Sequence, residues 1–436
     1  MKKLLKSVVP PLLSLVIVML GNGFFTTFVS LKFSESGYSN QLVGVLGAAY
    51  YLGMMLGASY VEPLIKRIGH IRSFALLASV NSAVIITQSF DVNLYLWTIY
   101  RILIGFCTSG FFIAIESWLL LSSSLKSRGR LLSLYMLTLY LAQGFGQFIL
   151  NISGITTLLP YAITIILSSL SVIPVTLMKS SGPTNEESSV VGIFQTIKRA
   201  PLGPLGCFVS GIIMSSFYGL APIFAHEISL SLFEISQFMG FTIIGGLLLQ
   251  WPIGYLSDIF SRRKVIMGVG IALSAITFII YQYHGIGFAP LMFFMIVFGG
   301  ISFTLYPLSI TYTCDHFSKN KTMGIVCSLL SVYGIGCIVG PLIAPRFMTI
   351  FGPGGLFVFM SILCSIYVLV CMWRVLHSKP LSEEDQVDYI PLPHAATIAS
   401  FIDVRQGLES EEAIDEYEEG HDPLNLLFEN EDEDLN

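Results

Sequence analysis

The chain has 436 residues, of which 54% are hydrophobic and 12% charged, about half the charged share of an ordinary soluble domain. The formal net charge of −5 combines two unlike regions, because residues 375–436 hold 18 of the 28 acidic residues and two of the 23 basic ones. This composition excludes a soluble enzyme, a nucleic-acid-binding protein and a secreted scaffold. The seven cysteines and seven histidines show no spacing typical of a metal site, so no metal ligand and no cofactor are predicted.

Apolar stretches long enough to cross a bilayer, which needs about 20 residues per helix, occur twelve times along the chain. They cover roughly residues 8–31, 40–61, 71–90, 94–119, 130–152, 157–178, 202–225, 236–257, 264–284, 287–312, 323–345 and 354–374. The first stretch continues past Asn22 to Leu31, so it is expected to be a membrane helix and not a cleaved signal peptide. The predicted fold class is an all-α integral membrane protein with twelve transmembrane helices.

Basic residues indicate the orientation, because short loops rich in Lys and Arg stay in the cytoplasm. If the N-terminus is inside, 18 of the 21 basic residues before position 375 fall in cytoplasmic segments, two (Lys32 and Arg346) fall in the opposite loops, and Arg101 lies within a span. Both termini are therefore predicted to be cytoplasmic.

The spans fall into two groups of six, which indicates two pseudo-symmetric bundles with a substrate site between them near the midplane. The predicted domains are an N-terminal bundle (1–178), a cytoplasmic linker (179–200), a C-terminal bundle (201–374) and an acidic tail (375–436). Blocks of like charge favour disorder, so the tail is expected to be solvated, with docking of a cytoplasmic partner as the alternative.

The loop after span eight has a Gly followed four residues later by an Asp and then by a basic cluster. It reads Gly254-Tyr-Leu-Ser-Asp258-Ile-Phe-Ser-Arg262-Arg263-Lys264. This loop resembles the signature loop of the major facilitator superfamily. In that reading Asp258 pairs with Arg262 or Arg263 and holds the cytoplasmic gate closed, while Gly254 permits close helix approach. The alternative is that the basic cluster only sets the topology. The first-half loop departs from the pattern, because Lys66 stands where the signature has Asp and Glu62 where it has Gly.

Four further strings resemble the YcaD-like subgroup of bacterial facilitators over nearly the whole chain. They are GHIRSFA (69–75), SGFFIAIESWLL (109–120), RGRLLSLYM (128–136) and YIPLPHAATIASFIDVR (389–405). The resemblance implies a transporter of the bacterial inner (plasma) membrane and does not indicate its substrate.

Span four carries Arg101-Ile-Leu-Ile-Gly105, which resembles the fourth-helix Arg motif of the family. At about 1.5 Å per residue, Arg101, Asn22 and Gln143 lie at one depth in the membrane. A charged side chain there normally faces a cavity or a partner, so these residues are expected to line the pathway and to hold an anionic group or modulate a proton site. The alternative is that Arg101 is bound by amides and joins helices.

Glu116 is the acidic residue placed deepest in a predicted span. It lies near the cytoplasmic end, within reach of Arg128, Arg130 or the basic loop at 66–72, so a gate salt bridge is the first hypothesis. The second hypothesis is that Glu116 is a proton-coupling carboxyl, because buried acids have raised pKa values. Glu62 is the next candidate for that role.

The remaining candidates belong to the helix interiors. Gly336 and Gly340 share one helix face and Pro341 favours a kink, so with Gly105 they are expected to serve helix packing. Gln147 in span five and four polar-tipped residues in the second half are further candidates to line the pathway, each with packing as the alternative: Tyr218, Gln250, Trp251 and Tyr306.

The sequence therefore predicts a secondary transporter that moves a small-molecule substrate across the lipid bilayer by alternating access, coupled to protons. It predicts no enzymatic activity and no nucleic-acid partner. The alternatives are an uncoupled uniporter or exchanger, and a membrane sensor or scaffold that signals through its acidic tail.

Overall fold

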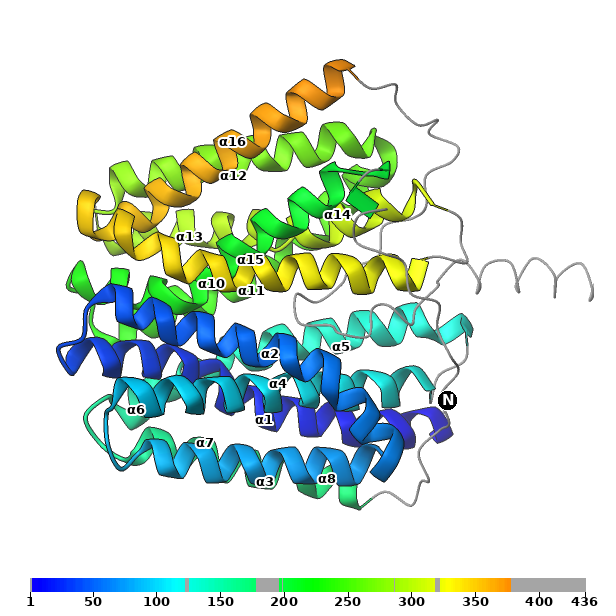
Figure 1. Cartoon of the computed structure of the whole chain (residues 1–436), viewed down its shortest axis with the longest axis vertical. Helices are drawn as coiled ribbons and strands as arrows, with labels where there is room; N and C mark the ends of the chain where they lie inside the picture. Colours follow the sequence, from blue (N-terminus) through cyan, green and yellow to red (C-terminus); the bar gives the residue numbers. More distant parts are fainter. Residues whose placement is uncertain are drawn as a thin grey trace, which may run out of the picture.

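The chain folds into long helices that run side by side, so that successive spans are roughly antiparallel (Figure 1). The computed structural model describes residues 2–121, 125–177, 196–197, 199–285, 287–317 and 322–377. These residues form helices and connections and contain no strand. Most of the predicted linker and nearly all of the predicted tail lie outside the described residues.

The first half of the chain supplies the lower group of helices in Figure 1. Its elements are α1 (Lys2–Glu35), α2 (Asn40–Ile68), α3 (His70–Gln88), α4 (Leu94–Leu121), α5 (Leu125–Gly146), α6 (Ile149–Ser153), α7 (Leu159–Leu170) and α8 (Val172–Thr176). The second half supplies the upper group: α10 (Leu202–Glu227), α11 (Leu232–Ile259), α12 (Arg262–Tyr283), α13 (Phe288–Ser302), α14 (Leu305–Cys314), α15 (Thr322–Phe351) and α16 (Gly355–His377).

Eleven segments within the described residues are long and apolar enough to cross a membrane, with α7 and α8 forming one segment and α13 and α14 another. The twelfth predicted span corresponds to α5 and α6. Its helix α5 is not among the eleven, and its first turns carry Lys126, Arg128 and Arg130. With α5 included the segments match the predicted twelve, and the all-α membrane fold is confirmed.

Most contacts between helices lie within one half of the chain, and a smaller set joins the two halves. In the first half α2 packs on α4, and α1 packs on α5 and α7; in the second half α10 packs on α15, α11 on α13 and α12 on α16. The halves meet where α2 contacts α15, α5 contacts α11, and α1 and α2 contact α10. The four helices α1, α2, α10 and α15 therefore lie at the centre of the molecule.

Close helix approach within each half depends on glycine. A Cβ atom at Gly105 in α4 would overlap the backbone carbonyl of Tyr50 in α2, and one at Gly340 in α15 would overlap that of Ile212 in α10. Gly336 lies in the same way against the carbonyl of Phe208. Larger residues at these positions would push the helices apart.

The two ends of the helix bundle differ in charge. The end at which α2, α11 and α16 terminate is called here the basic end, and it carries Lys66, Arg67, Arg262, Arg263 and Arg374. It is the end that the distribution of charge predicts to be cytoplasmic. The other is called the opposite end.

Candidate functional site

A cavity of about 350 Å³ lies at the interface between the two halves. Its walls come from α1, α2, α4 and α5 of the first half and from α10 and α15 of the second. Its polar and aromatic lining consists of Asn22, Thr26, Tyr50, Tyr51, Ser59, Glu62, Thr108, Ser109, Phe112, Tyr140, Gln143, Gln147, Tyr218, Ser331 and Tyr333. The volume is within the range of sites for small organic molecules, about 300–1,000 Å³.

Amide side chains from α1 and α5 face one part of this cavity. The Asn22 side-chain amide donates to the hydroxyl of Thr108 at 3.4 Å. Gln147, just past the end of α5, accepts from the hydroxyl of Thr27 and donates to the backbone carbonyl of Gly23, both at 2.8 Å, so both ends of its amide bind α1. The amide of Gln143 contacts the sulfur of Met19 at 4.0 Å. Asn22 and Gln143 therefore keep more hydrogen-bonding capacity for a ligand than Gln147 does.

The cavity is open toward the basic end. Its lining follows α2 from Tyr50 toward the basic end as far as Glu62, and on α15 it begins at Cys327. Ser59 and Cys327 are exposed there. Glu62 pairs with Lys66 across 2.8 Å at this mouth.

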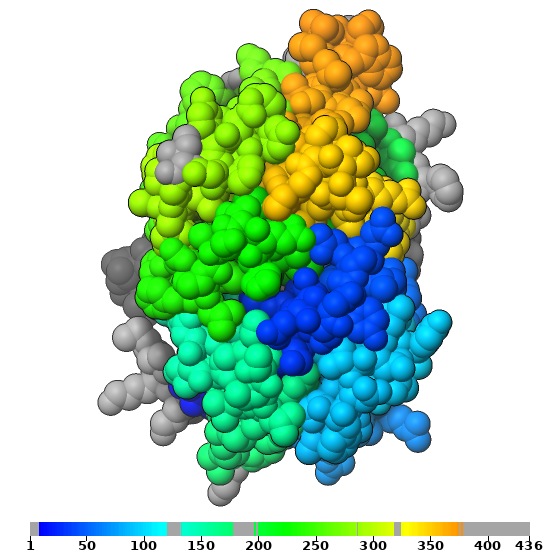
Figure 2. All heavy atoms as spheres, turned by 90° about the vertical axis from the view of Figure 1, so that its left-hand side faces the viewer, coloured from blue at the N-terminus to red at the C-terminus, as the bar shows by residue number. Residues whose placement is uncertain are grey.

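At the opposite end, contacts between the halves seal the interface. Gly44 in α2 lies against the backbone carbonyl of Pro341 in α15. Asn40 donates to the carboxylate of Glu227 at 2.8 Å, and the hydroxyl of Ser236 in α11 donates to the side-chain oxygen of Asn151 in α6 at 3.1 Å. Figure 2 shows this end, where first-half atoms in blue lie directly beside second-half atoms in green.

Arg101 lies one layer beyond the cavity, toward the opposite end. It is 3% exposed, and the carbon of its guanidinium lies 4.4 Å from the ring centroid of Tyr50, a cation–π distance. It lines a separate space of about 10 Å³ that shares Tyr50, Tyr51 and Tyr218 with the cavity. The structure therefore separates Arg101 from Asn22 and Gln143, which the depth estimate had grouped with it.

Glu116 does not line the cavity. It is 3% exposed, lies beside the hydroxyl of Tyr135 in α5, and interacts electrostatically with Tyr306 in α14, on the other side of the interface. The side chains of Arg128 and Arg130, its predicted partners in a gate salt bridge, lie outside the described residues.

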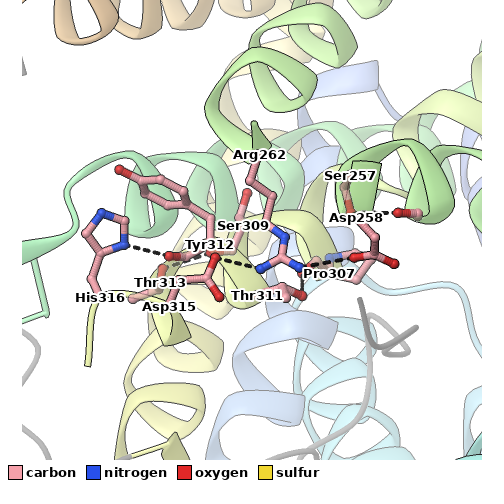
Figure 3. Close-up of polar contacts among 11 residues, drawn as sticks. Ser257, Asp258, Arg262, Pro307, Ser309, Thr311, Tyr312, Thr313, Asp315 and His316 are labelled. Atoms are coloured by element: carbon pink, nitrogen blue, oxygen red, sulfur yellow. Dashed lines mark hydrogen bonds and ion pairs between the residues drawn. The ribbon is translucent and has the colours of Figure 1, made fainter. Parts of the chain in front are cut away.

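The signature loop forms a charged cluster between α11, α12 and the end of α14 (Figure 3). One Arg262 nitrogen binds Asp258 at 3.1 Å and another binds Asp315 at 2.6 Å. The Arg262 side chain is 2% exposed and that of Asp315 3%, whereas that of Asp258 is 32% exposed. The spacing indicated Asp258 but not Asp315, which is 53 residues further along the chain than Arg262.

His316 lies beside this cluster. A ring nitrogen contacts the backbone carbonyl of Tyr312 at 2.8 Å, which requires the proton on that nitrogen. Burial holds the pKa of His316 below its usual value, and the positive charges of Arg263 and Arg199 add to this effect. The imidazole is therefore neutral at neutral pH.

The other candidates from the second half are dispersed. Tyr218 lines the cavity, whereas Trp251 is 78% exposed on the outer surface, stacked on Tyr255. Gln250 is buried outside the cavity lining, and the Tyr306 ring packs 4.6 Å from that of Tyr333, which does line it. Sequence reasoning missed Tyr50 and Tyr51; the signal available was two adjacent tyrosines within a predicted span.

The family model described as Major Facilitator Superfamily matches residues 12–244 and 204–405. The chain belongs to the major facilitator superfamily. It is 27% identical over 372 residues to a protein of Escherichia coli O17:K52:H18 and to one of Shigella flexneri, each described as an uncharacterised MFS-type transporter YcaD. The alignment covers 84% of this chain and 96% of each relative.

Two solved structures share the superfamily fold. The nucleoside transporter NupG has a TM-score of 0.73 at 13% identity, over 87% of this chain and 100% of that one. A point mutant of NupG has a TM-score of 0.72 at 13% identity, over 84% of this chain and 99% of that one. Together with the family match and the apolar helices, this makes the chain a multi-pass membrane transporter of small molecules and not an enzyme.

Proposed function

We propose that this transporter is a secondary carrier that works by alternating access, and that the interface cavity is its substrate site in an inward-facing state. The observation that carries the proposal is a cavity between two six-span halves, open toward the basic end and sealed at the opposite end. Such an arrangement becomes a transport cycle when the two halves rock about the site.

We further propose that the carrier is coupled to protons through Glu116, in a bacterial inner membrane with both termini in the cytoplasm. Glu116 supports this role because its carboxyl is buried and lies near tyrosines of both halves, Tyr135 and Tyr306. The protonation of a carboxyl in such a place depends on whether the halves are together or apart, because their separation changes its solvation.

A second candidate function is uncoupled uniport or exchange. The observation that favours it is that Glu62 is the only carboxylate among the described residues lining the cavity, and that it pairs with Lys66. In that case Glu116 serves helix packing or the gate.

Two probes test alternating access without knowledge of the substrate. Cys327 is the only exposed cysteine of the seven, all of which are described, so its alkylation by a maleimide reports opening at the basic end. Spin labels at Ser36→Cys and Ser229→Cys, in a Cys327→Ser background, report separation of the halves at the opposite end. We expect conditions that lengthen the label distance to slow Cys327 alkylation. A label distance and an alkylation rate that rise or fall together, or that do not change, would contradict alternating access.

Coupling is tested with the same labels in proteoliposomes under an imposed pH gradient. We expect the gradient to shift the distance distribution of the wild type, and Glu116→Gln to remove the response, because the amide cannot take up a proton. Glu62→Gln, at the second coupling candidate, should keep the response, because the proposal places coupling at Glu116. A wild type that ignores the gradient would favour uncoupled transport, and a responsive Glu116→Gln would leave Glu116 a packing or gate residue.

A further inference from the structure

Arg101 has a buried guanidinium whose hydrogen-bonding capacity the described residues do not use. Its Nε and Nη1 atoms are buried and make no hydrogen bond to any described residue. None of the ion pairs found among the described residues includes Arg101. It packs on the face of the Tyr50 ring, at 4.4 Å, and also interacts electrostatically with Tyr51.

This environment argues against a purely structural role. A charge within a membrane protein is costly unless a carboxylate, a carbonyl or water surrounds it. An arginine that joins helices would donate to acceptors on the neighbouring helix, and two of the Arg101 nitrogens do not. The cost is explained if another group satisfies the guanidinium in another state of the transporter.

The small space beside Arg101 indicates where that group would bind. Its volume of about 10 Å³ is close to that of a single water molecule. It is enclosed by α1, α2 and α4 of the first half and by α10 of the second, with Val29, Val43, Gly219 and Arg101 among its walls. It lies between the cavity and the sealed opposite end, so it enlarges when the halves separate there.

We propose that Arg101 is an anion subsite, and that the substrate is a small molecule with an oxyanion, a carboxylate or a phosphate ester, on an apolar or aromatic body. The oxyanion would bind the guanidinium in the outward-facing state, and the Tyr50 ring covers the same guanidinium in the inward-facing state. The body of the molecule fits the neighbouring wall of Tyr50, Tyr51, Phe112 and Tyr140, with Asn22 and Gln143 for further hydrogen bonds. This inference rests on the alternating access proposed above.

Ligand-dependent thermal unfolding of the purified protein tests this site. The probes are benzoate, phenyl phosphate and benzamide, the last a neutral analogue of benzoate. We expect one or both anions to raise the unfolding temperature in a saturable way and benzamide to bind at least tenfold more weakly. Benzoate and phenyl phosphate distinguish the two oxyanions.

Variants locate the effect at Arg101. Arg101→Gln should lose the discrimination between benzoate and benzamide, and Arg101→Lys should weaken anion binding about tenfold, because an ammonium lacks the planar fork of a guanidinium. Arg346→Gln, at an exposed position at the opposite end, should behave like the wild type. Without ligand, Arg101→Gln should unfold at the same temperature as the wild type or higher, whereas a helix-joining role predicts a lower temperature.

Equal binding of benzoate and benzamide, no shift with either anion, or an unchanged anion response in Arg101→Gln would each overturn the proposal. These results are distinguishable from failure of alternating access. If the Ser36–Ser229 label distance and Cys327 alkylation still change in opposite directions, alternating access is retained and only the anion subsite is lost.

Discussion

At the scale of single residues, the best-defined contact in the structure is the pairing of Arg262 with two carboxylates. Breaking a buried ion pair by removing one partner costs about 3–5 kcal/mol, whereas a partly exposed ion pair contributes about 1 kcal/mol or less. Asp315 is buried and Asp258 is not. The two aspartates should therefore differ in what they contribute.

We predict that Asp315→Asn lowers the free energy of unfolding by about 3 kcal/mol and Asp258→Asn by about 1 kcal/mol or less. Thermal unfolding of the purified variants, with Arg346→Gln as a control for loss of an exposed charge, measures the difference. Equal loss in both variants would show that the exposed fraction of the carboxylate does not determine its contribution.

The same pair of variants tests the gate hypothesis for the signature loop. We predict that Asp258→Asn, although folded and expressed like the wild type, alkylates faster at Cys327, because the gate hypothesis assigns Asp258 to holding the basic end closed in the outward-facing state. The two ion pairs of Arg262 within the described residues join elements of the second half, α11, α12 and the end of α14. An unchanged alkylation rate would make this cluster a structural support of the second half.

At the scale of helices, the contact between α2 and α15 holds the opposite end closed. A Cβ at Gly44 would overlap the carbonyl of Pro341 and come within 2.9 Å of the Pro345 ring. The glycine is therefore needed for the closed contact but not for the fold of either half.

We predict that Gly44→Ala disfavours closure at the opposite end by about 1–3 kcal/mol, the usual cost of overpacking. Cys327 alkylation should then slow, by up to about tenfold for each 1.4 kcal/mol, since that free energy changes the equilibrium between the two states tenfold. The matched control is Gly268→Ala in α12, where a Cβ would meet nothing within 4 Å. A wild-type alkylation rate in Gly44→Ala would place the seal elsewhere.

The helices also show what the sequence predicts at this scale. Twelve spans follow from apolar length alone, because each must cross the same bilayer core. The breaks between α5 and α6, near Gln147, and between α13 and α14, near Phe303, were not predicted. Both lie inside continuous apolar stretches, where hydropathy does not distinguish a helix from a short interruption.

At the scale of the whole molecule, two hydrogen bonds between described residues link the halves at the opposite end, Asn40 to Glu227 and Ser236 to Asn151. The second joins α6 to α11, on the far side of the interface from the contact between α2 and α15. Fixing it covalently should hold the whole molecule in one state.

We predict that Asn151→Cys with Ser236→Cys forms a disulfide on oxidation, because the two native side chains approach within 3.1 Å. In the oxidised protein Cys327 should stay accessible, and its alkylation rate should no longer change under conditions that change it in the reduced protein. A reductant should restore that change. The single variants are the controls. Exchange that persists in the oxidised double variant would contradict closure by this pair.

The candidate site could be predicted only in part. Asn22, Gln143 and Tyr218 line the cavity, as their polarity within apolar spans had indicated. Trp251 lies on the outer surface, because residue type does not show which face of α11 packs inward. Arg101 was expected beside Asn22, but an estimate of depth ignores the Tyr50 ring that separates it from the cavity.

The one-sided shape of the cavity has a consequence for inhibition. In the proposed cycle, closing the basic end narrows the cavity, so that its first-half and second-half walls approach across the space that a ligand occupies. A compound too large for this space, yet able to enter from the basic end, would keep the halves apart there and leave the opposite-end contacts of Gly44 and Asn40 intact. It would stop turnover without entering the site from the other side of the membrane, so solute on that side would weaken it only by drawing the carrier out of the inward-facing state.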